Sequence, residues 1–382
     1  MKEYKLSQLL EIKNGKDHKE LPNGDYPVFG SGGVMRYVNE YLYDKASILL
    51  PRKGSLNNIQ YCDVPFWTVD TLYYTEVNEK IACPYYLYNY LCLLDLSGLD
   101  TGTGVPSMTF DSYYNIKVLL PEIEEQKRVA SVLQNLDHKI ALNRQINDNL
   151  EAMAKQLYNY WFVQFDFINE EGKPYKSSGG AMVWNEKLKR EIPKGWSGVS
   201  LKDLAVTSRN AITPVENEVY QLFSIPSFDA CGSYSLDNGS DIKSDKFVLQ
   251  EGQLLVSKLN PWFNRVVWVP RGTNMIGSTE FVVLNPNNKS ESGYIYSVIK
   301  SPKFVAYCSQ AATGTSHSQR RVSPDVLMAF KVAYEPDVVQ KYGCFMENIQ
   351  KRQAELLSET ATLTKQRNEF LPLLMNGQIS IQ

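Results

Sequence analysis

The chain has 382 residues, which is long for one ordinary domain and predicts two or three. Hydrophobic residues make up 43% and charged residues 21%, as in globular proteins, and no apolar run approaches the roughly 18–20 residues of a membrane-spanning helix. The net charge is −2: residues 1–120 carry 11 Lys and Arg against 14 Asp and Glu, and residues 196–335 carry 13 against 12. This composition excludes a membrane protein and a nucleic-acid binder that depends on bulk positive charge.

The cysteines and the N-terminus favour a reduced, cytoplasmic protein. The six cysteines stand at least nine residues apart, which excludes CxxC zinc and redox motifs. With only three histidines in the chain, a structural metal site is not expected. The opening MKEYKLSQLLEIKNG has neither an apolar core nor a small-residue cleavage site, so we expect no signal peptide.

Residues 1–120 predict a first globular module, rich in Tyr, Gly, Asn and Pro and built from short β-like runs. Polar donors cluster after the apolar run ILLP at 48–51, and hydroxyl groups follow in the Gly-rich stretch 101–109. FGSGG at 29–33 fits neither FxGxG nor GxGxxG and has no βαβ pattern around it. A Gly-rich turn is therefore favoured over a cofactor loop.

Residues 121–162 predict a long amphipathic helix. Its apolar positions step alternately by four and three residues: Val129, Leu133, Leu136, Ile140, Leu150, Met153, Leu157 and Trp161. Asn143 and Asn147 fall where this seam would place apolar groups. A period of 3.5 is typical of a helix that packs lengthwise on another helix. Such a helix extends roughly 60 Å at about 1.5 Å per residue, so it needs a partner of similar length.

Residues 163–195 predict a linker. Asp166, Glu171 and Lys173 imitate the two carboxylates and the lysine of a magnesium-dependent nuclease. They lie in the polar stretch FDFINEEGKPYKSSGG, which predicts no strand to fix their geometry, so a solvated linker is favoured. The aromatic residues between Tyr158 and Phe167 could stack on nucleic acid, but the favoured interpretation is that they anchor the helix end in a module core or in a partner subunit.

Residues 196–335 predict a second module with its own donor clusters, after the apolar run LLVS and at 316–321. The motif Asn260-Pro261-Trp262-Phe263 is similar to the Asn-Pro-Pro-aromatic motif with which methyltransferases hold a flipped adenine, but it lacks the second proline. The sequence contains no GxxxxGK[ST] loop and no nucleophile motif that pairs Ser or Cys with His. We expect the chain itself to catalyse nothing.

Residues 336–376 predict a second long helix, followed by a tail at 377–382. The same stepping runs through Phe345, Ile349, Leu356, Leu363, Phe370 and Leu373, with Arg352, Glu359 and Gln366 in polar slots. The simplest account is that the two long helices pack together as a coiled coil. The alternative is that each lies separately on its own module.

Short stretches of the first half recur in the second half in the same order. KLSQLLEIKNG (5–15) is echoed by SLKDLAVTSRN (200–210), ASILLPRKGSLNN (46–58) by GQLLVSKLNPWFN (252–264), and TGTGVPS (101–107) by ATGTSHS (312–318). Each half therefore predicts a β-rich module followed by a long helix. The expected fold class is α+β, with two globular β-rich domains joined by two long helices.

Several stretches resemble the specificity (S) subunit of Type I restriction-modification systems. LPEIEEQKRVASVLQNLDHKI (120–140) is similar to the start of that family's central helix, and LEAMAKQLYNYWFVQFDF (150–167) to its end. EIPKGWSGVSLKDL (191–204) resembles the start of the second target-recognition domain. YPVFGSGGVMRYVNEYL (26–42) and the stretches ILLPRKGSLNN and PFWTVDTLYY (within 48–74) match the first. Matches are patchy in 205–335.

The resemblance implies a function. Residues 1–120 and 196–335 would be target-recognition domains that each read one half of a split, asymmetric site in double-stranded DNA. The helices would form an antiparallel coiled-coil spacer that fixes the distance between half-sites. Two methyltransferase (M) subunits would dock on this scaffold and restriction/translocase (R) subunits on them, in a prokaryotic cytoplasm. S-adenosylmethionine, ATP and magnesium would belong to those partners, and this chain would hold no cofactor.

DNA contacts would come from exposed loops. Guanine is read by Arg or Lys and adenine by Asn or Gln, and phosphates accept from Lys, Arg and hydroxyl groups. The candidate DNA-binding residues are Arg52, Lys53, Ser55, Asn57, Asn58, Thr101, Thr103 and Ser107 in the first module, and Lys258, Asn260, Arg265, Ser316, His317, Gln319, Arg320 and Arg321 in the second. The alternative is that these are ordinary solvated loops.

Two other functions stay open on the residues alone. The chain could be a duplicated adaptor that binds protein partners and ignores DNA, which the near-neutral charge favours. It could also be an enzyme with an unrecognised site.

Overall fold

The computed structural model of the chain describes residues 1–99, 106–314 and 319–381. The candidate residues Thr101, Thr103, Ser316 and His317 lie outside these ranges. The chain forms two compact units, one of residues 1–142 and 360–382 and the other of residues 143–359. Two long helices, α4 (Ile123–Tyr158) and α10 (Pro336–Met375), contribute to both units. None of the described helices is both long enough and apolar enough to cross a membrane.

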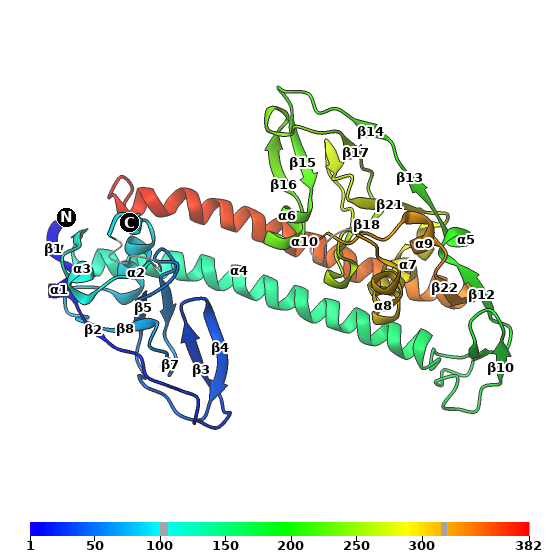
Figure 1. Cartoon of the computed structure of the whole chain (residues 1–382), viewed down its shortest axis with the longest axis horizontal. Coiled ribbons are helices and arrows are strands. Elements are labelled where there is room, and N and C mark those ends of the chain that lie inside the picture. Colours follow the sequence, from blue (N-terminus) through cyan, green and yellow to red (C-terminus); the bar gives the residue numbers. More distant parts are fainter. Residues whose placement is uncertain (100–105, 315–318, 382) are drawn as a thin grey trace. The chain divides into compact units, whose positions relative to one another are not determined.

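The first unit contains the first module and one end of each long helix (Figure 1). Its elements before α4 are β1 (Lys2–Lys5), α1 (Leu6–Leu9), β2 (Leu10–Lys13), β3 (Tyr26–Gly30), β4 (Gly33–Val38), β5 (Ser47–Pro51), β6 (Gln60–Cys62), β7 (Trp67–Thr68), β8 (Leu72–Val77), α2 (Pro84–Cys92), η1 (Ser97–Leu99), α3 (Phe110–Tyr114) and β9 (Lys117–Leu120). The strands form sheets in the orders β2-β8-β5-β6, β4-β3-β7 and β1-β9.

The core of the first unit depends on the long helices. Strand β5, SILLP, is buried along its whole length at the centre of its sheet, as its run of apolar residues predicts. Val129 and Leu133 of α4 and Leu371 of α10 belong to the same hydrophobic cluster as the module's own Ile48. The module therefore buries its apolar face only together with the helices.

The second unit contains the second module and the other end of each helix. After α4 it comprises η2 (Asn159–Val163), β10 (Met182–Asn185), β11 (Arg190–Pro193), β12 (Ser197–Ser200), α5 (Leu201–Leu204), β13 (Ala205–Ser208), β14 (Ala211–Ile212), β15 (Val219–Phe223), α6 (Ile225–Cys231), β16 (Ser235–Asn238), η3 (Gly239–Asp241), β17 (Lys246–Val248), β18 (Leu254–Ser257), η4 (Pro261–Phe263), β19 (Val266–Trp268), β20 (Met275–Gly277), β21 (Phe281–Pro286), η5 (Lys289–Glu291), α7 (Ser292–Lys300), α8 (Pro302–Ala311), α9 (Pro324–Met328) and β22 (Lys331–Tyr334).

The two modules share one topology. The sheet β2-β8-β5-β6 of the first module has the same antiparallel order as β13-β21-β18-β19 of the second. The strand pair that precedes each long helix also matches, β1 with β9 and β12 with β22. The three-stranded sheet β4-β3-β7 recurs as β16-β15-β20, and in the second module β17 and β14 extend it to five strands in the order β14-β17-β20-β15-β16. The repeats in the sequence therefore correspond to a structural duplication.

Helices α4 and α10 pack together in antiparallel directions, which confirms the expected α+β fold with two β-rich domains and two long helices. Within the first unit, Arg367 of α10 forms an ion pair with Asp137 of α4 at 3.0 Å. Within the second, Asn143 Nδ2 donates to Glu359 Oε2 at 3.0 Å, and the Tyr342 hydroxyl donates to the Ala154 carbonyl at 3.4 Å. The partners on α10 move back along the chain as those on α4 move forward.

The apolar seam of α4 follows the sequence pattern closely. Val129, Leu133 and Ile140 are buried, and Leu136, Leu150 and Leu157 are half-buried. Met153 is exposed, and Ala154 takes its place in the seam.

The seam of α10 departs from the predicted positions at three residues. Ile349, Leu356 and Leu363 are buried, as the stepping predicts. Phe345, Phe370 and Leu373 are exposed, and in each case the next residue along is buried instead: Met346, Leu371 and Leu374.

The stretch 163–195, predicted to be a linker, is folded. Strands β10 and β11 form a hairpin, and Trp161, Phe162, Phe165 and Phe167 are buried in the hydrophobic core of the second unit. This confirms the aromatic residues as an anchor for the end of α4. The Asp166 carboxylate accepts hydrogen bonds from the Ser177 backbone at 2.7 Å and hydroxyl at 2.6 Å, which lower its pKa and fix a turn.

Candidate nucleic-acid interface

In the first module the polar loop after β5 lies against the residues that precede α3. The Gly54 backbone N–H donates to the Pro106 carbonyl at 2.9 Å, and the Met108 N–H donates to the Arg52 carbonyl at 3.0 Å. Gly54 has a φ of +96°, a left-handed conformation that glycine adopts without steric cost. These bonds bring Lys53 opposite Ser107, two of the predicted DNA-binding residues.

The second module repeats this arrangement with other residues. The Asn260 N–H donates to the Arg320 carbonyl at 2.7 Å, and the Val322 N–H donates to the Lys258 carbonyl at 3.1 Å. Asn260 has a φ of +50° at the position of Gly54, and asparagine is among the few other residues that tolerate this region. Leu259 consequently lies opposite Arg321, as Lys53 lies opposite Ser107. Loops that are far apart in the sequence therefore meet at equivalent places in both modules.

The candidate residues of the first module divide into presented side chains and side chains that hold the loop. Lys53 and Ser55 are exposed. Asn57 Oδ1 accepts from the Leu96 N–H at 3.1 Å, and Asn58 Nδ2 donates to the Ser31 carbonyl at the end of the β3–β4 hairpin. Arg52 is half-buried, with Nη1 donating to the Asp70 carbonyl at 3.3 Å and its guanidinium 6.0 Å from the centre of the Tyr73 ring.

The candidate residues of the second module divide in the same way. Asn260 is buried, and its Oδ1 accepts from the Arg320 N–H at 3.1 Å. Gln319 is exposed, and Lys258 and Arg320 are partly exposed.

Two arginines of the second module are held by carboxylates. Arg265 donates from Nε and Nη2 to both oxygens of Asp229, at 2.6 and 2.7 Å, which lowers the pKa of that carboxyl. Arg321 forms the same two-bond pair with Glu280, at 3.0 Å for each bond, and the pairing raises the pKa of the guanidinium. The Arg265 side chain is only 10% exposed, whereas that of Arg321 is 45% exposed. Arg321 is therefore presented at the surface and Arg265 is not.

Sequence reasoning missed two exposed aromatic residues in this loop. Trp262 and Phe263, on the turn η4, are 40% and 57% exposed although both are large and apolar. They were read only as part of a methyltransferase-like motif. Their position in the loop that aligns with the Lys- and Asn-containing loop of the first module was the available signal.

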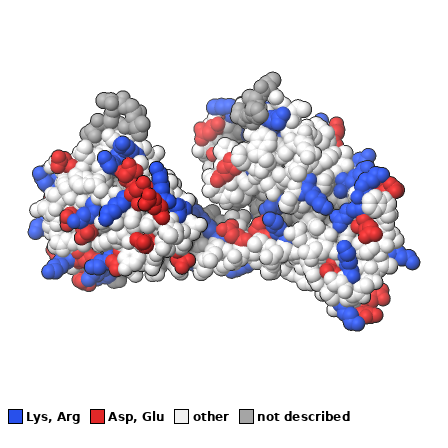
Figure 2. Space-filling model, turned by 60° about the horizontal axis from the view of Figure 1, so that its bottom comes forward, with Lys and Arg blue, Asp and Glu red and all other residues white. Residues whose placement is uncertain are grey.

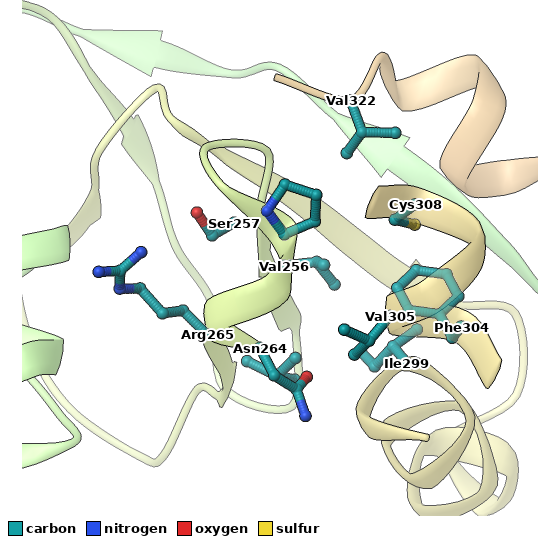
Figure 3. A pocket seen from close by; sticks show the side chains of 11 residues that line it. Val256, Ser257, Asn264, Arg265, Ile299, Phe304, Val305, Cys308 and Val322 are labelled. Atoms are coloured by element: carbon teal, nitrogen blue, oxygen red, sulfur yellow. The ribbon is translucent and has the colours of Figure 1, made fainter. Parts of the chain in front are cut away.

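The η4 turn is packed on helices α7 and α8. Figure 3 shows Ile299, Phe304, Val305 and Cys308 on the helix side of a small cavity, and Arg265 pointing away from it. The volume of about 10 Å³ is at most that of one water molecule, so the cavity is a packing feature and does not hold a ligand. Burial raises the pKa of the Cys308 thiol to about 12.

Positive and negative charges are mixed over the surface. Figure 2 shows Lys and Arg interspersed with Asp and Glu on the face in view. Across the described ranges, no three His, Cys, Asp or Glu side chains come together in a way that could hold a metal ion. The exposed cations of the loop pairs, Lys53 and Arg321, are thus local features in a near-neutral protein.

Comparison with known proteins identifies similar sequences. Residues 1–152 match the family described as the Type I restriction modification DNA specificity domain. The chain is 22% identical over 393 aligned residues to the Type I restriction enzyme MjaIX specificity subunit of Methanocaldococcus jannaschii, covering 95% of this chain and 86% of that protein. It is 32% identical over 160 residues to the MjaVIII specificity subunit of the same organism, covering 41% and 32% of the two chains.

The fold has a counterpart among solved structures. The S subunit of a Type I restriction-modification system from M. genitalium matches 98% of this chain and 95% of its own, with a TM-score of 0.65 and 15% identity. The fold of this chain is thus that of a solved S subunit. The first 152 residues match the Type I restriction modification DNA specificity domain, and the chain is similar over nearly its whole length to a specificity (S) subunit of a Type I restriction enzyme.

Proposed function

We propose that each module of this chain reads one half of a split, asymmetric site in double-stranded DNA. The observation that carries the proposal is the repeated loop pair, in which residues 52–54 meet 106–108 and residues 258–260 meet 320–322 through the same pattern of backbone bonds. The same backbone framework occurs in both modules but carries different side chains, so the two modules could recognise different DNA sequences. Lys53 and Ser55 are presented in the first module, and Gln319, Arg320 and Arg321 in the second.

Helices α4 and α10 would set the separation of the two half-sites. Each is a continuous helix, of 36 and 40 residues respectively. A buried seam with polar positions such as Asn143, which bonds to Glu359, favours one fixed register. A fixed register gives a fixed separation, and DNA sites are matched to protein spacing.

The chain would act in the prokaryotic cytoplasm with two methyltransferase subunits and with restriction/translocase subunits. S-adenosylmethionine, ATP and magnesium would be bound by those partners. Partner subunits would also supply much of the attraction to phosphate, because this chain has a net charge of −2.

Methylome sequencing of cells with and without this chain tests the proposal. We expect a methylated motif that consists of two defined parts separated by an unspecified gap, and that disappears without the chain. An unbroken motif, or no change in methylation, would contradict split recognition.

Replacement of residues 196–335 by the equivalent module of a related subunit tests the independence of the two readers. We expect one half of the methylated motif to change, because the loop pair 52–54 and 106–108 lies wholly within the first module. A change in both halves would show that the modules do not read separately. Loss of all methylation together with loss of the bound methyltransferase subunits would indicate an assembly defect, which copurification detects.

A further inference from the structure

We propose that Trp262 and Phe263 form an aromatic wedge that contacts the bases of duplex DNA, and that Arg265 is a positioning residue for Phe263. The inference rests on the proposed DNA-reading function. It assigns the apolar part of the contact surface in the second module and removes Arg265 from the residues that read bases.

The two aromatic side chains are presented by the protein rather than used in its core. They are adjacent in the η4 turn, their ring centroids are 6.0 Å apart, and the ring planes meet at 47°. Trp262 is 40% exposed and Phe263 is 57% exposed. Large aromatic side chains bury apolar area in a core or an interface, so an exposed pair on one turn favours a contact surface.

The turn that carries the pair is held at both ends. Asn260 and Asn264 both adopt left-handed backbone conformations, with φ of 50° and 49°. Asn260 bonds to the Arg320 backbone through its N–H and its Oδ1, and Asn264 Nδ2 donates to the Lys300 carbonyl at 3.0 Å. Pro261 between them is buried and has a fixed φ. The exposed rings therefore stand on a fixed base and lose little conformational freedom on binding.

Arg265 supports Phe263 from behind. Its guanidinium lies 4.5 Å from the centre of the Phe263 ring, and both of its bonds go to the Asp229 carboxylate. With 10% of its side chain exposed, Arg265 has little capacity to reach a base edge. The guanidinium covers one face of the ring, and the exposed surface of Phe263 remains available to a partner.

The surroundings of the pair suit DNA. Lys258 and Arg320 belong to the two loops that Asn260 joins, so partly exposed cations flank the aromatic turn. Proteins that insert apolar side chains between base steps also use Arg and Lys in the groove, and Arg and Lys contact phosphates in most protein–DNA complexes. The aligned positions of the first module are Leu56, which is buried, and Asn57, which bonds to Leu96. At this loop position the exposed aromatic pair is therefore present in the second module and absent from the first.

The test uses the complex of this chain with its methyltransferase partner, on the DNA motif found by methylome sequencing. We compare Trp262→Ala and Phe263→Ala with Trp184→Ala, a control on the β10–β11 hairpin that removes a tryptophan 58% exposed. We expect affinity to fall about tenfold or more in the two loop variants and to stay unchanged in the control. Unchanged affinity in both loop variants would overturn the wedge. A loss of bound methyltransferase instead of a loss of DNA affinity would also overturn it, because the pair would then be a protein contact.

A fluorescent probe locates the wedge. With 2-aminopurine placed singly along the second half-site, away from the methylated base, we expect the wild-type complex to raise fluorescence at one base step and Phe263→Ala to abolish that rise. If fluorescence stays low at every step while the loop variants still bind weakly, insertion is excluded and the wedge fails. If the wild-type complex forms no specific DNA complex at all, the proposed function fails before the wedge is tested.

A double-mutant cycle tests the role of Arg265. A positioning role predicts that Arg265→Ala weakens binding only when Phe263 is present, so Arg265→Ala with Phe263→Ala binds like Phe263→Ala alone. It also predicts that Asp229→Asn, a milder change, weakens binding in the same direction while the methylated motif stays the same. Relaxed recognition at one base pair in Arg265→Ala would instead show that Arg265 reads a base.

Discussion

At the scale of residues, the loop pairs contain two kinds of polar side chain with different expected effects on binding. Asn260, Asn57 and Arg265 bond to the protein, whereas Lys53 and Gln319 are exposed and Lys258 and Arg320 are partly exposed. Substitution of the first kind changes loop geometry, and substitution of the second removes a contact.

Arg320→Ala is expected to weaken DNA binding of the methyltransferase complex by a similar factor on specific and unrelated DNA. If Arg320 contacts one phosphate, the slope of log affinity against log salt becomes less steep by about 0.9. The measurement is a salt titration of affinity on both DNA types. The matched control is Arg352→Ala, an exposed arginine on α10 paired with Glu355 at 3.1 Å, which should leave the slope unchanged. A loss confined to the specific DNA would show that Arg320 reads a base instead.

The sequence showed that these loops correspond to each other in the two modules, but it did not show what each side chain contacts. Residue type suggests a donor, but only the fold reveals that Asn260 bonds to the Arg320 backbone 60 residues away. Arg265 illustrates the same limit, because its carboxylate partner Asp229 lies on helix α6 in a different part of the module. Hydrogen bonds between distant segments leave no periodic signal in the chain.

At the scale of elements, the two long helices were predictable and the register of one of them was not. Hydropathy finds the stripe of Ile349, Leu356 and Leu363 on α10. The buried face of α10 also contains polar residues. Gln353 is buried and contacts Glu151 of α4, and Arg367 is half-buried and contacts Asp137 of α4. Polar residues with specific partners look like surface residues in the sequence, so Phe345 and Phe370 were placed in the seam and their neighbours Met346 and Leu371 were not.

Asp substitutions in the seam should separate the helices. Ile140 and Leu356 are 7% and 1% exposed, and Ile140→Asp with Leu356→Asp removes two buried aliphatic side chains at roughly 2–5 kcal/mol each, in addition to the cost of burying charge. We expect a large drop in the urea midpoint of unfolding and loss of binding to the split site. Leu142→Asp is the control, because Leu142 on α4 is 44% exposed. Equal midpoints for the double variant and the control would refute the packed seam.

At the scale of the whole molecule, duplication explains why two modules with little sequence in common share one framework. The sheet orders β2-β8-β5-β6 and β13-β21-β18-β19 are equivalent, and each module is followed by a long helix. The order β4-β3-β7 also recurs as β16-β15-β20, with one antiparallel and one parallel pair in each. Strands β14 and β17 extend this sheet in the second module, within the region where the sequence resemblance is patchy. If the two modules read different DNA sequences, as proposed, their contact segments are expected to differ while the framework and the helices keep their pattern.

A longer spacer should change the gap in the recognised site and nothing else. Seven residues inserted into α4 after Leu142 and seven into α10 after Glu359, where the two compact units divide, add two helical turns to each helix and preserve the 3.5-residue seam. At about 1.5 Å per residue the insertion lengthens each helix by roughly 10 Å, which corresponds to about three base pairs at 3.4 Å each. We therefore expect methylome sequencing to show the same two half-sites with a gap about three base pairs longer. An insertion of seven residues in α4 alone is the control, and it should disturb the pairing of Asn143 with Glu359 and reduce methylation. Because the loop pairs lie within the modules, a change in either half-site in the double insertion would mean that the helices take part in reading bases and do not act only as a spacer.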